Sequence, residues 1–182
     1  MKEEIKNIKV IFIPGNGGDG NTFYGWFPYI KKELEKLKIE VISQTFPDGN
    51  FARAKHWLPF IKELGADENT ILIGHSSGAI AAMKFAEDNK IFGSVLVSAY
   101  YTDLGLESER VSNYFHKLFD WQKIKNNQKF IIQFNSTNDH LIPISEARFV
   151  HGKLDTDYHE LAEGHFQQTN FHQLITAIKK YL

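Results

Sequence analysis

Short apolar runs alternate with longer amphipathic stretches along the whole chain. The apolar runs are rich in Val, Ile, Leu and Phe, which is typical of strands buried on both faces of a parallel sheet. This alternation predicts an α/β fold with about six mostly parallel strands and helices on both faces. The predicted strands are Lys9–Ile13, Glu40–Thr45, Thr70–Ile73, Gly93–Ser98, Phe130–Phe134 and Asp157–Leu161.

The amphipathic stretches repeat apolar residues at helical spacing, and we interpret their apolar faces as core. The first has Pro28 near its start, where proline is tolerated, and the second ends at Gly65. The third, Ala79–Glu87, is rich in small residues. In the last, Asn170 and Gln173 have a spacing close to a capping box. The faces are Ile30, Leu34 and Leu37; Trp57, Ile61 and Leu64; Ile80 and Met83; and Phe171, Leu174, Ile175, Ile178 and Leu182.

Residues 99–127 depart from this rhythm, because they form a longer connection than usual between two predicted strands. We expect the segment both to contain a covering helix and to overhang part of a site. Its aromatic residues suggest an apolar pocket for an acyl group or a side chain. They are Tyr100, Tyr101, Tyr114, Phe115, Phe119 and Trp121.

Length and composition narrow the class of protein. A chain of 182 residues with 42% hydrophobic and 24% charged residues predicts one globular domain, residues 1–182. The net charge is −1 with both signs interspersed, so we expect no binding to nucleic acid or to a membrane. The absence of cysteine excludes disulfides, thiolate metal sites and a cysteine nucleophile. The first apolar run, Val10–Ile13, is too short for the core of a signal peptide or for a membrane span, which favours a cytoplasmic location.

The most informative segment is Gly74-His75-Ser76-Ser77-Gly78, which joins an apolar strand to an Ala-rich helix. A Gly-x-Ser-x-Gly pattern in this position predicts a nucleophile elbow, with Ser76 on a strained turn above the sheet. The two glycines are needed because strand and helix pass very close there. The helix that follows directs backbone N–H groups toward a developing oxyanion.

A serine hydroxyl needs a base and an orienting acid, which in this type of fold follow the serine in the order acid, then histidine. Asp139 follows the strand Phe130–Phe134, and His165 follows the strand Asp157–Leu161. Both lie at the expected carboxyl ends of strands. The sequence therefore predicts a catalytic triad of Ser76, Asp139 and His165.

Other acids and histidines fit these roles less well. Asp103 also follows a strand and is the alternative acid, whereas Asp155 and Asp157 lie at the start of a strand. His140 adjoins the proposed acid and is either a wall of the site or an ordinary loop residue. The remaining histidines lie inside the elbow or on helices, strands and solvated stretches: His56, His75, His116, His151, His159 and His172.

An oxyanion hole requires two backbone N–H groups. One is expected from Ser77, directly after the nucleophile. The other is expected from the glycine-rich loop that follows the first strand, where we assign it to Asn16 with Gly17 as the alternative.

The same loop matches a dinucleotide-binding pattern at Gly15, Gly17 and Gly20, with Asp48 where an acid would bind ribose. No apolar-periodic helix opens within the motif, and the chain is too short for an added substrate domain. Dinucleotide binding is therefore a remote alternative, and no cofactor is expected. The sequence has no cluster of His and carboxylate residues, so it does not predict a catalytic metal.

With these residues assigned, the chain resembles the retinoblastoma-binding protein 9 family of small serine hydrolases over nearly its whole length. The matching blocks are Pro14–Gly18, Trp57–Phe60, Gly74–Met83, Leu96–Tyr100 and Gly164–Gln167. The resemblance implies a six-stranded α/β-hydrolase sheet flanked by helices, the triad named above, and hydrolysis of small ester or amide substrates.

Two residues depart from that family's pattern. The family name refers to a Leu-x-Cys-x-Glu motif for the retinoblastoma pocket, but the stretch Leu64–Glu68 has Ala66 in place of cysteine. We therefore doubt that this partner is bound. His140 stands where a proline is expected, which affects the local loop rather than the acid.

These observations lead to one main hypothesis and one from another class. The main hypothesis is a serine hydrolase that cleaves small esters or amides, amino-acid esters among them, through an acyl-enzyme. The second is a non-catalytic protein-interaction module that keeps the hydrolase frame. An interaction module has no need of three triad residues at these positions, which favours the enzyme.

Overall fold

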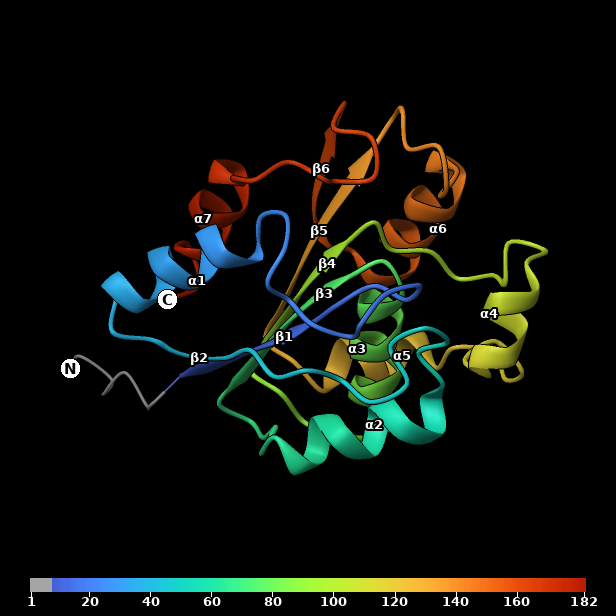
Figure 1. The fold of residues 1–182 in the computed structure, drawn as a ribbon, viewed down its shortest axis with the longest axis horizontal. Helices are drawn as coiled ribbons and strands as arrows, with labels where there is room; N and C mark the ends of the chain where they lie inside the picture. Colours follow the sequence, from blue (N-terminus) through green and yellow to red (C-terminus); the bar gives the residue numbers. More distant parts are fainter. Residues whose placement is uncertain (1–7) are drawn as a thin grey trace.

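In the computed structural model, which describes residues 8–182, six strands form one sheet in the order β2-β1-β3-β4-β5-β6 (Figure 1). Every neighbouring pair is parallel. The α/β class with a largely parallel sheet is therefore confirmed. The strands are β1 (Lys9–Ile13), β2 (Glu40–Ile42), β3 (Thr70–His75), β4 (Gly93–Val97), β5 (Phe130–Ser136) and β6 (Asp157–Leu161).

Helices cover both faces of the sheet (Figure 1). Successive residues of a strand point to opposite faces, so Val10 packs with the side of α1 and α7, while Ile11 packs with the side of α2, α3, α5 and α6. The near-continuous apolar runs of the sequence follow from this double burial. The helices are α1 (Phe27–Lys36), α2 (Ala54–Glu63), α3 (Ser77–Asp88), α4 (Glu107–Ser112), α5 (Trp121–Asn126), α6 (Ile144–Leu154) and α7 (His172–Ile178).

Several element boundaries differ from the sequence prediction. Strand β2 ends at Ile42 rather than Thr45, because the chain turns away to bury Phe46, whose amide donates to the Gly20 carbonyl at 2.7 Å. Helix α1 ends at Lys36, so Leu37 leaves the apolar face and is exposed.

The predicted capping box of the last helix is wrong. Helix α7 begins at His172, and no side chain caps it. The preceding residue, Phe171, has a non-helical backbone (φ −150°, ψ 71°) and is buried against the rings of Trp26, Phe134 and Phe166. Tertiary packing therefore starts this helix later than local capping chemistry would.

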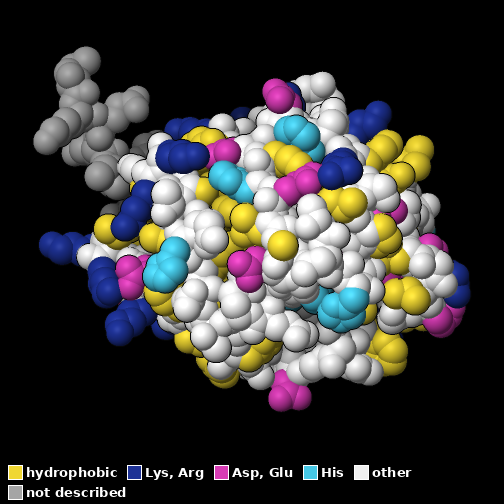
Figure 2. Space-filling view, turned by 90° about the horizontal axis from the view of Figure 1, so that it is seen from above, with side chains coloured by type: hydrophobic (Ala, Val, Ile, Leu, Met, Phe, Trp, Pro, Cys, Tyr) yellow, Lys and Arg dark blue, Asp and Glu magenta, His cyan; other side chains and the backbone are white. Residues whose placement is uncertain are grey.

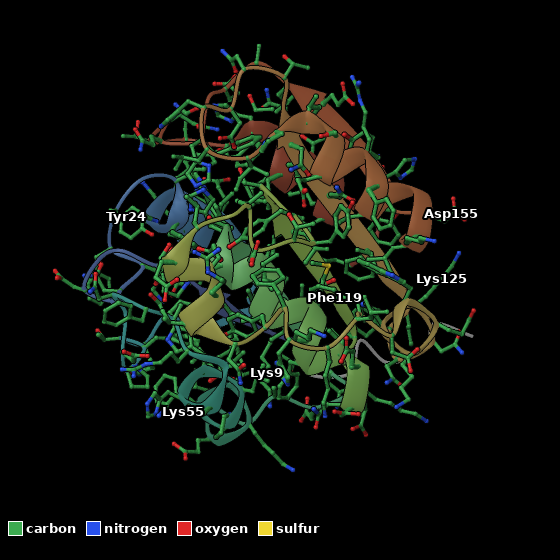
Figure 3. The ribbon with its side chains drawn as sticks, turned by 90° about the vertical axis from the view of Figure 1, so that its right-hand side faces the viewer. Lys9, Tyr24, Lys55, Phe119, Lys125 and Asp155 are labelled. Atoms are coloured by element: carbon green, nitrogen blue, oxygen red, sulfur yellow. The ribbon has the colours of Figure 1, made fainter. Side chains whose placement is uncertain are left out.

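The connection between β4 and β5 holds two short helices, α4 and α5. Helix α5 packs on α3 and α6, and Phe119 lies against α3, where the Lys84 ammonium is 4.0 Å from the centre of its ring (Figure 3). Helix α4 projects beyond the sheet (Figure 1). The expected covering helix is thus present, and α4 is the part of the segment that approaches the candidate site.

Positive and negative side chains are interspersed on the face shown in Figure 2, with hydrophobic side chains between them. Residues 1–7 lie outside the described residues. Across residues 8–182, no helix has the length and apolar character needed to cross a membrane.

Candidate active site

Ser76 occupies a sharp turn between β3 and α3. Its backbone has φ 54° and ψ −119°, a combination that a non-glycine residue adopts only where the surroundings hold it. The serine is buried to 8% exposure at the carboxyl end of the sheet. This is the geometry of the nucleophile elbow that the sequence pattern predicts.

The two glycines of the elbow allow the strand and the helix to touch. A Cβ on Gly74 would lie 2.2 Å from the Gly78 carbonyl oxygen, and a Cβ on Gly78 would lie 2.3 Å from the Ile13 carbonyl oxygen. No side chain fits in either space. The spacing of Gly-x-Ser-x-Gly is therefore required by packing in this chain.

His165 and Asp139 form a hydrogen-bonded pair. The Nδ1 atom of His165 lies 2.9 Å from Asp139 Oδ2, and the two side chains are 8% and 1% exposed. Asp139 also accepts bonds from the Ser98 hydroxyl and from the Leu141 and Ile142 amides. Because a carboxylate accepts from Nδ1–H, the other ring nitrogen of His165 is left with a lone pair for proton transfer.

The hydrogen bonds around Asp139 set its charge. Burial opposes ionisation of the carboxyl, but the bonds from His165, Leu141 and Ile142 outweigh it and lower its pKa below the ordinary value. Asp139 is therefore an anion at neutral pH, which suits a residue that orients an imidazole and stabilises its protonated form.

The loop of His165 is attached to the elbow through His75. The His75 Nε2–H group donates to the His165 carbonyl at 3.0 Å, and the two imidazole rings lie 4.8 Å apart. No hydrogen bond joins Ser76 Oγ to His165 within residues 8–182. Such bonds are often long without substrate and tighten in the reacting complex.

His75 is a buried neutral histidine. Burial and the nearby His165 lower its pKa to about 3, and its Nδ1 atom has no hydrogen-bond partner within residues 8–182. It cannot act as a base at the surface of the site. It instead donates a hydrogen bond to the backbone of His165.

The loop after β1 lies beside the nucleophile. A Cβ on Gly15 would lie 3.5 Å from Ser76 Cβ. The Gly17 amide already donates to the Gly49 and Asn50 carbonyls, whereas the bonds found within residues 8–182 give the Asn16 amide no acceptor. The amide of Ser77, the first residue of α3, precedes the intrahelical ladder. Of the two candidates in this loop, the Asn16 amide rather than the Gly17 amide is therefore free, among the described residues, to join the Ser77 amide in an oxyanion hole.

The alternative acid and the other histidines lie in other environments. Asp103 accepts from the Gly105 amide in its own turn and is not bonded to an imidazole. The His140 ring centre is 6.3 Å from that of His165, so His140 borders the site. Among the others, His159 stacks on Phe134.

The residues of the dinucleotide pattern have structural roles. Asp48 binds the Arg53 guanidinium through both carboxylate oxygens at 2.8 Å, and these bonds lower its pKa. The missing Cβ of Gly20 makes room for the Phe46 carbonyl. The nearest helix, α1, starts only at Phe27. Within the described part of the chain, the loop therefore lacks the helix N-terminus and the free acidic side chain that bind a dinucleotide.

Sequence reasoning missed Ser98 and Glu109 near the site, and it named Tyr100 only as an aromatic residue of the segment 99–127. The Ser98 hydroxyl donates to Asp139. The Tyr100 hydroxyl lies between the Ser77 hydroxyl and the buried Glu109 carboxylate, which also accepts from the Asn16 side chain. The spacing of residues offered no signal for Glu109, since it lies in a charged stretch that reads as solvated helix surface. Within residues 8–182, no three His, Asp or Glu side chains gather closely enough to bind a metal ion.

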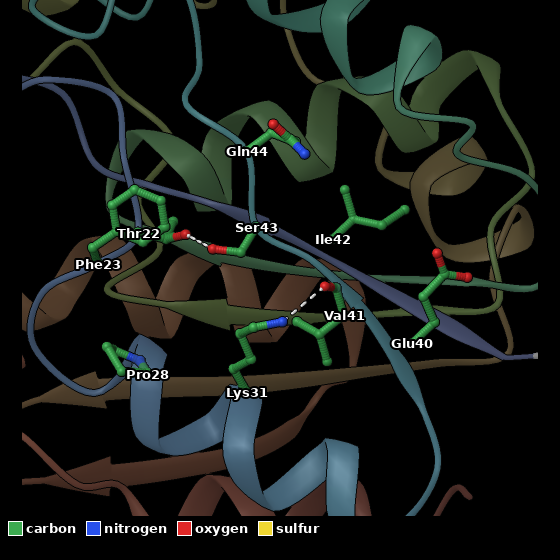
Figure 4. A pocket seen from close by; sticks show the side chains of 9 residues that line it. All are labelled: Thr22, Phe23, Pro28, Lys31, Glu40, Val41, Ile42, Ser43 and Gln44. Carbon is green, nitrogen blue, oxygen red and sulfur yellow. Dashed lines mark hydrogen bonds between the residues drawn. The ribbon is translucent and has the colours of Figure 1, made fainter.

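A cavity of about 570 Å³ lies apart from these residues, between α1 and the edge strand β2 (Figure 4). Across it the Lys31 ammonium donates to the Val41 carbonyl at 3.3 Å, and the Thr22 and Ser43 hydroxyls are 2.6 Å apart. None of the predicted site residues lines it.

A model of the serine hydrolase family matches residues 10–182. The chain belongs to the serine hydrolase family. It is 45% identical to the serine hydrolase RBBP9 of Rattus norvegicus over 177 residues, which cover 96% of this chain and 95% of that protein. The likeness to the retinoblastoma-binding protein 9 family is thereby confirmed, and the chain is a hydrolase rather than a non-catalytic module.

Solved structures agree on the fold of this serine hydrolase. The ydeN gene product of Bacillus subtilis superposes with a TM-score of 0.85 at 25% identity, covering 96% of this chain and 98% of that one. Est1E of Butyrivibrio proteoclasticus, with ferulic acid bound, superposes with a TM-score of 0.74 at 14% identity, covering 98% of this chain and 89% of that one. The second likeness extends to the α/β-hydrolase fold alone.

Proposed function

We propose that this hydrolase cleaves small ester or amide substrates through an acyl-enzyme, with Ser76 as nucleophile, His165 as base and Asp139 as orienting acid. Amino-acid esters belong to the substrate class. The observation that carries the proposal is the strained elbow at Ser76, with the His165–Asp139 pair attached to it through His75.

The chemistry follows from this arrangement. Nε2 of His165 takes the proton from Ser76 Oγ as that oxygen bonds to the substrate carbonyl carbon. The Asn16 and Ser77 amides stabilise the oxyanion, and the bond to the leaving group breaks as His165 returns the proton to it. Water then attacks the acyl-enzyme by the reverse sequence, which releases the acid and free Ser76.

The stretch in place of the retinoblastoma-binding motif supports the absence of that partner. Residues Leu64–Glu68 end helix α2 and enter a tight turn, where Asp67 bonds Thr70 and Asn69 and pairs with Lys9. Ala66 packs against the core. A peptide bound in a groove must be free to extend, and this segment is held by its own hydrogen bonds.

The decisive experiment is labelling with a fluorophosphonate, which reacts with an activated serine. Ser76→Ala should abolish labelling and the hydrolysis of a panel of aryl esters, amino-acid esters and aminoacyl amides. The matched control is Ser108→Ala, because Ser108 is exposed on α4 and should leave both signals unchanged. Labelling that persists in Ser76→Ala, for example at Ser77, would show that the nucleophile is another residue.

A further inference from the structure

Glu109 is a buried carboxylate at the edge of the site. It is 5% exposed and belongs to α4, the short helix between β4 and β5. Acidic side chains are almost never buried to this degree without a partner. Within residues 8–182 no lysine, arginine or histidine forms an ion pair with it, so its partners must be neutral groups.

Each oxygen of Glu109 has one such partner. Oε1 accepts from the Asn16 side-chain amide at 2.9 Å, and Oε2 accepts from the Tyr100 hydroxyl at 2.7 Å. Burial and the Glu109 charge raise the pKa of Tyr100 well above its ordinary value, so this hydroxyl keeps its proton and donates.

The network ends at the residue next to the nucleophile. The Ser77 hydroxyl lies 3.2 Å from the Tyr100 hydroxyl. The Tyr100 proton is used by Glu109, so the Ser77 hydroxyl donates its own proton to the Tyr100 oxygen. Glu109 thus links Asn16, which is 93 residues away in the chain, to the start of helix α3.

We propose that Glu109 is a positioning residue for the oxyanion hole, acting through the Asn16 side chain on one side and through Tyr100 and Ser77 on the other. The inference rests on the proposed function, because it assigns a role to residues whose amides would bind the oxyanion. Within residues 8–182 the Glu109 side chain bonds Asn16 and Tyr100 and makes no hydrogen bond to Ser76, His165 or Asp139.

The physical need for such a residue comes from the loop that carries Asn16. It contains Gly15, Gly17 and Gly18, and a Cβ on either of the last two would meet nothing within 4 Å, so packing constrains this stretch little. A single oxyanion donor is worth about 10²–10³ in kcat when it is in place. Misplacing one by about 1 Å costs a large part of that gain.

The test uses Glu109→Ala, Glu109→Gln, Asn16→Ala and the double variant Glu109→Ala/Asn16→Ala. The exposed Glu107 of the same helix, which pairs only with Arg110, provides the matched control Glu107→Gln. Substrates are one neutral and one cationic ester of equal size. The measurements are kcat, KM, Tm and the affinity of a trifluoromethyl ketone, which forms an oxyanion on the serine.

Glu109→Ala should lower kcat about 10- to 100-fold for both esters, while KM changes less than about threefold. The affinity for the trifluoromethyl ketone should fall by a factor similar to that of kcat. Asn16→Ala, which removes one of the two linkages, should also lower kcat, by no more than Glu109→Ala does. The double variant should be no worse than Glu109→Ala, because that variant already lacks the bond to Asn16. Glu109→Gln should stay within about fivefold of the wild type. Its oxygen can still accept from Asn16 while its NH₂ group donates to Tyr100.

Three results would overturn the proposal. The first is an unchanged kcat in Asn16→Ala, which decides the matter even if Glu109→Ala does not fold. The second is a lower Tm without a loss of ketone affinity relative to substrate, which would mean a structural role. The third is a rise in KM of Glu109→Gln for the cationic ester alone, which would mean that the carboxylate binds substrate charge. Wild-type turnover by Ser76→Ala would instead defeat the proposed function itself.

Discussion

Replacing the buried His75 should change how the stability of the protein depends on pH. In the folded state its pKa is lowered to about 3, chiefly by burial, whereas an ordinary histidine titrates at 6.5. Between these two values the unfolded chain binds a proton that the folded chain does not. The free energy of unfolding therefore falls as the pH falls from about 6.5 toward 3.

The magnitude follows from the difference between the two pKa values. Each pH unit inside the window is worth about 1.4 kcal/mol, so His75 should cost the protein about 2 kcal/mol between pH 7 and pH 5. Over the whole window the cost approaches about 5 kcal/mol, a large share of the stability of a typical domain. Protonation of Asp139 also destabilises the protein, but at lower pH, because its pKa lies below the ordinary value of 3.8.

The assay is urea unfolding of the wild type and His75→Gln at half-unit steps from pH 5 to pH 8. Glutamine does not titrate, and its NH₂ group can replace the bond from His75 Nε2 to the His165 carbonyl. The variant should lose about 2 kcal/mol less than the wild type between pH 7 and 5. His116→Gln, at an exposed position, should keep the wild-type slope. Equal slopes in the wild type and His75→Gln would refute the reasoning.

Two further predictions concern the acid and the elbow. Asp139→Asn should lower kcat about 10³- to 10⁴-fold, because asparagine stabilises the wrong tautomer of His165. Asp103→Asn should change kcat roughly tenfold or less. If steady-state kinetics gave the reverse ranking, Asp103 would be the acid. Gly78→Ala should prevent accumulation of folded protein or abolish labelling of Ser76, because its Cβ would meet the Ile13 carbonyl at 2.3 Å; a stable variant that labels at the wild-type rate would contradict this packing argument.

The parts of the molecule that the sequence predicted are those specified by local pattern and chain order. Strand β1 matches its predicted bounds because its apolar run is buried on both sides and ends at Pro14. The bounds of the half-exposed edge strand β6 match as well. The proximity of Asp139 and His165 follows from topology: the carboxyl ends of the adjacent parallel strands β5 and β6 meet at one edge of the sheet.

The parts that the sequence did not predict depend on contacts between distant segments. Glu109 is buried where α4 meets the loop of Asn16 and the Tyr100 side chain, and no spacing within α4 reveals those contacts. The start of α7 is set by the packing of Phe171 among other aromatic rings, which overrides the local capping residues. Both are tertiary effects that a residue pattern does not encode.

The two outer strands of the sheet, β2 and β6, bear on the tendency of the protein to aggregate in concentrated solution. An open edge offers unpaired backbone groups to which a strand from another molecule can add. Strand β2 offers only three residues, and the Lys31 ammonium already occupies its Val41 carbonyl. Strand β6 carries Asp157 and Glu160, which are paired with Lys180 and Arg148. Short length on one side and charge on the other therefore protect the sheet from growing into aggregates by strand addition.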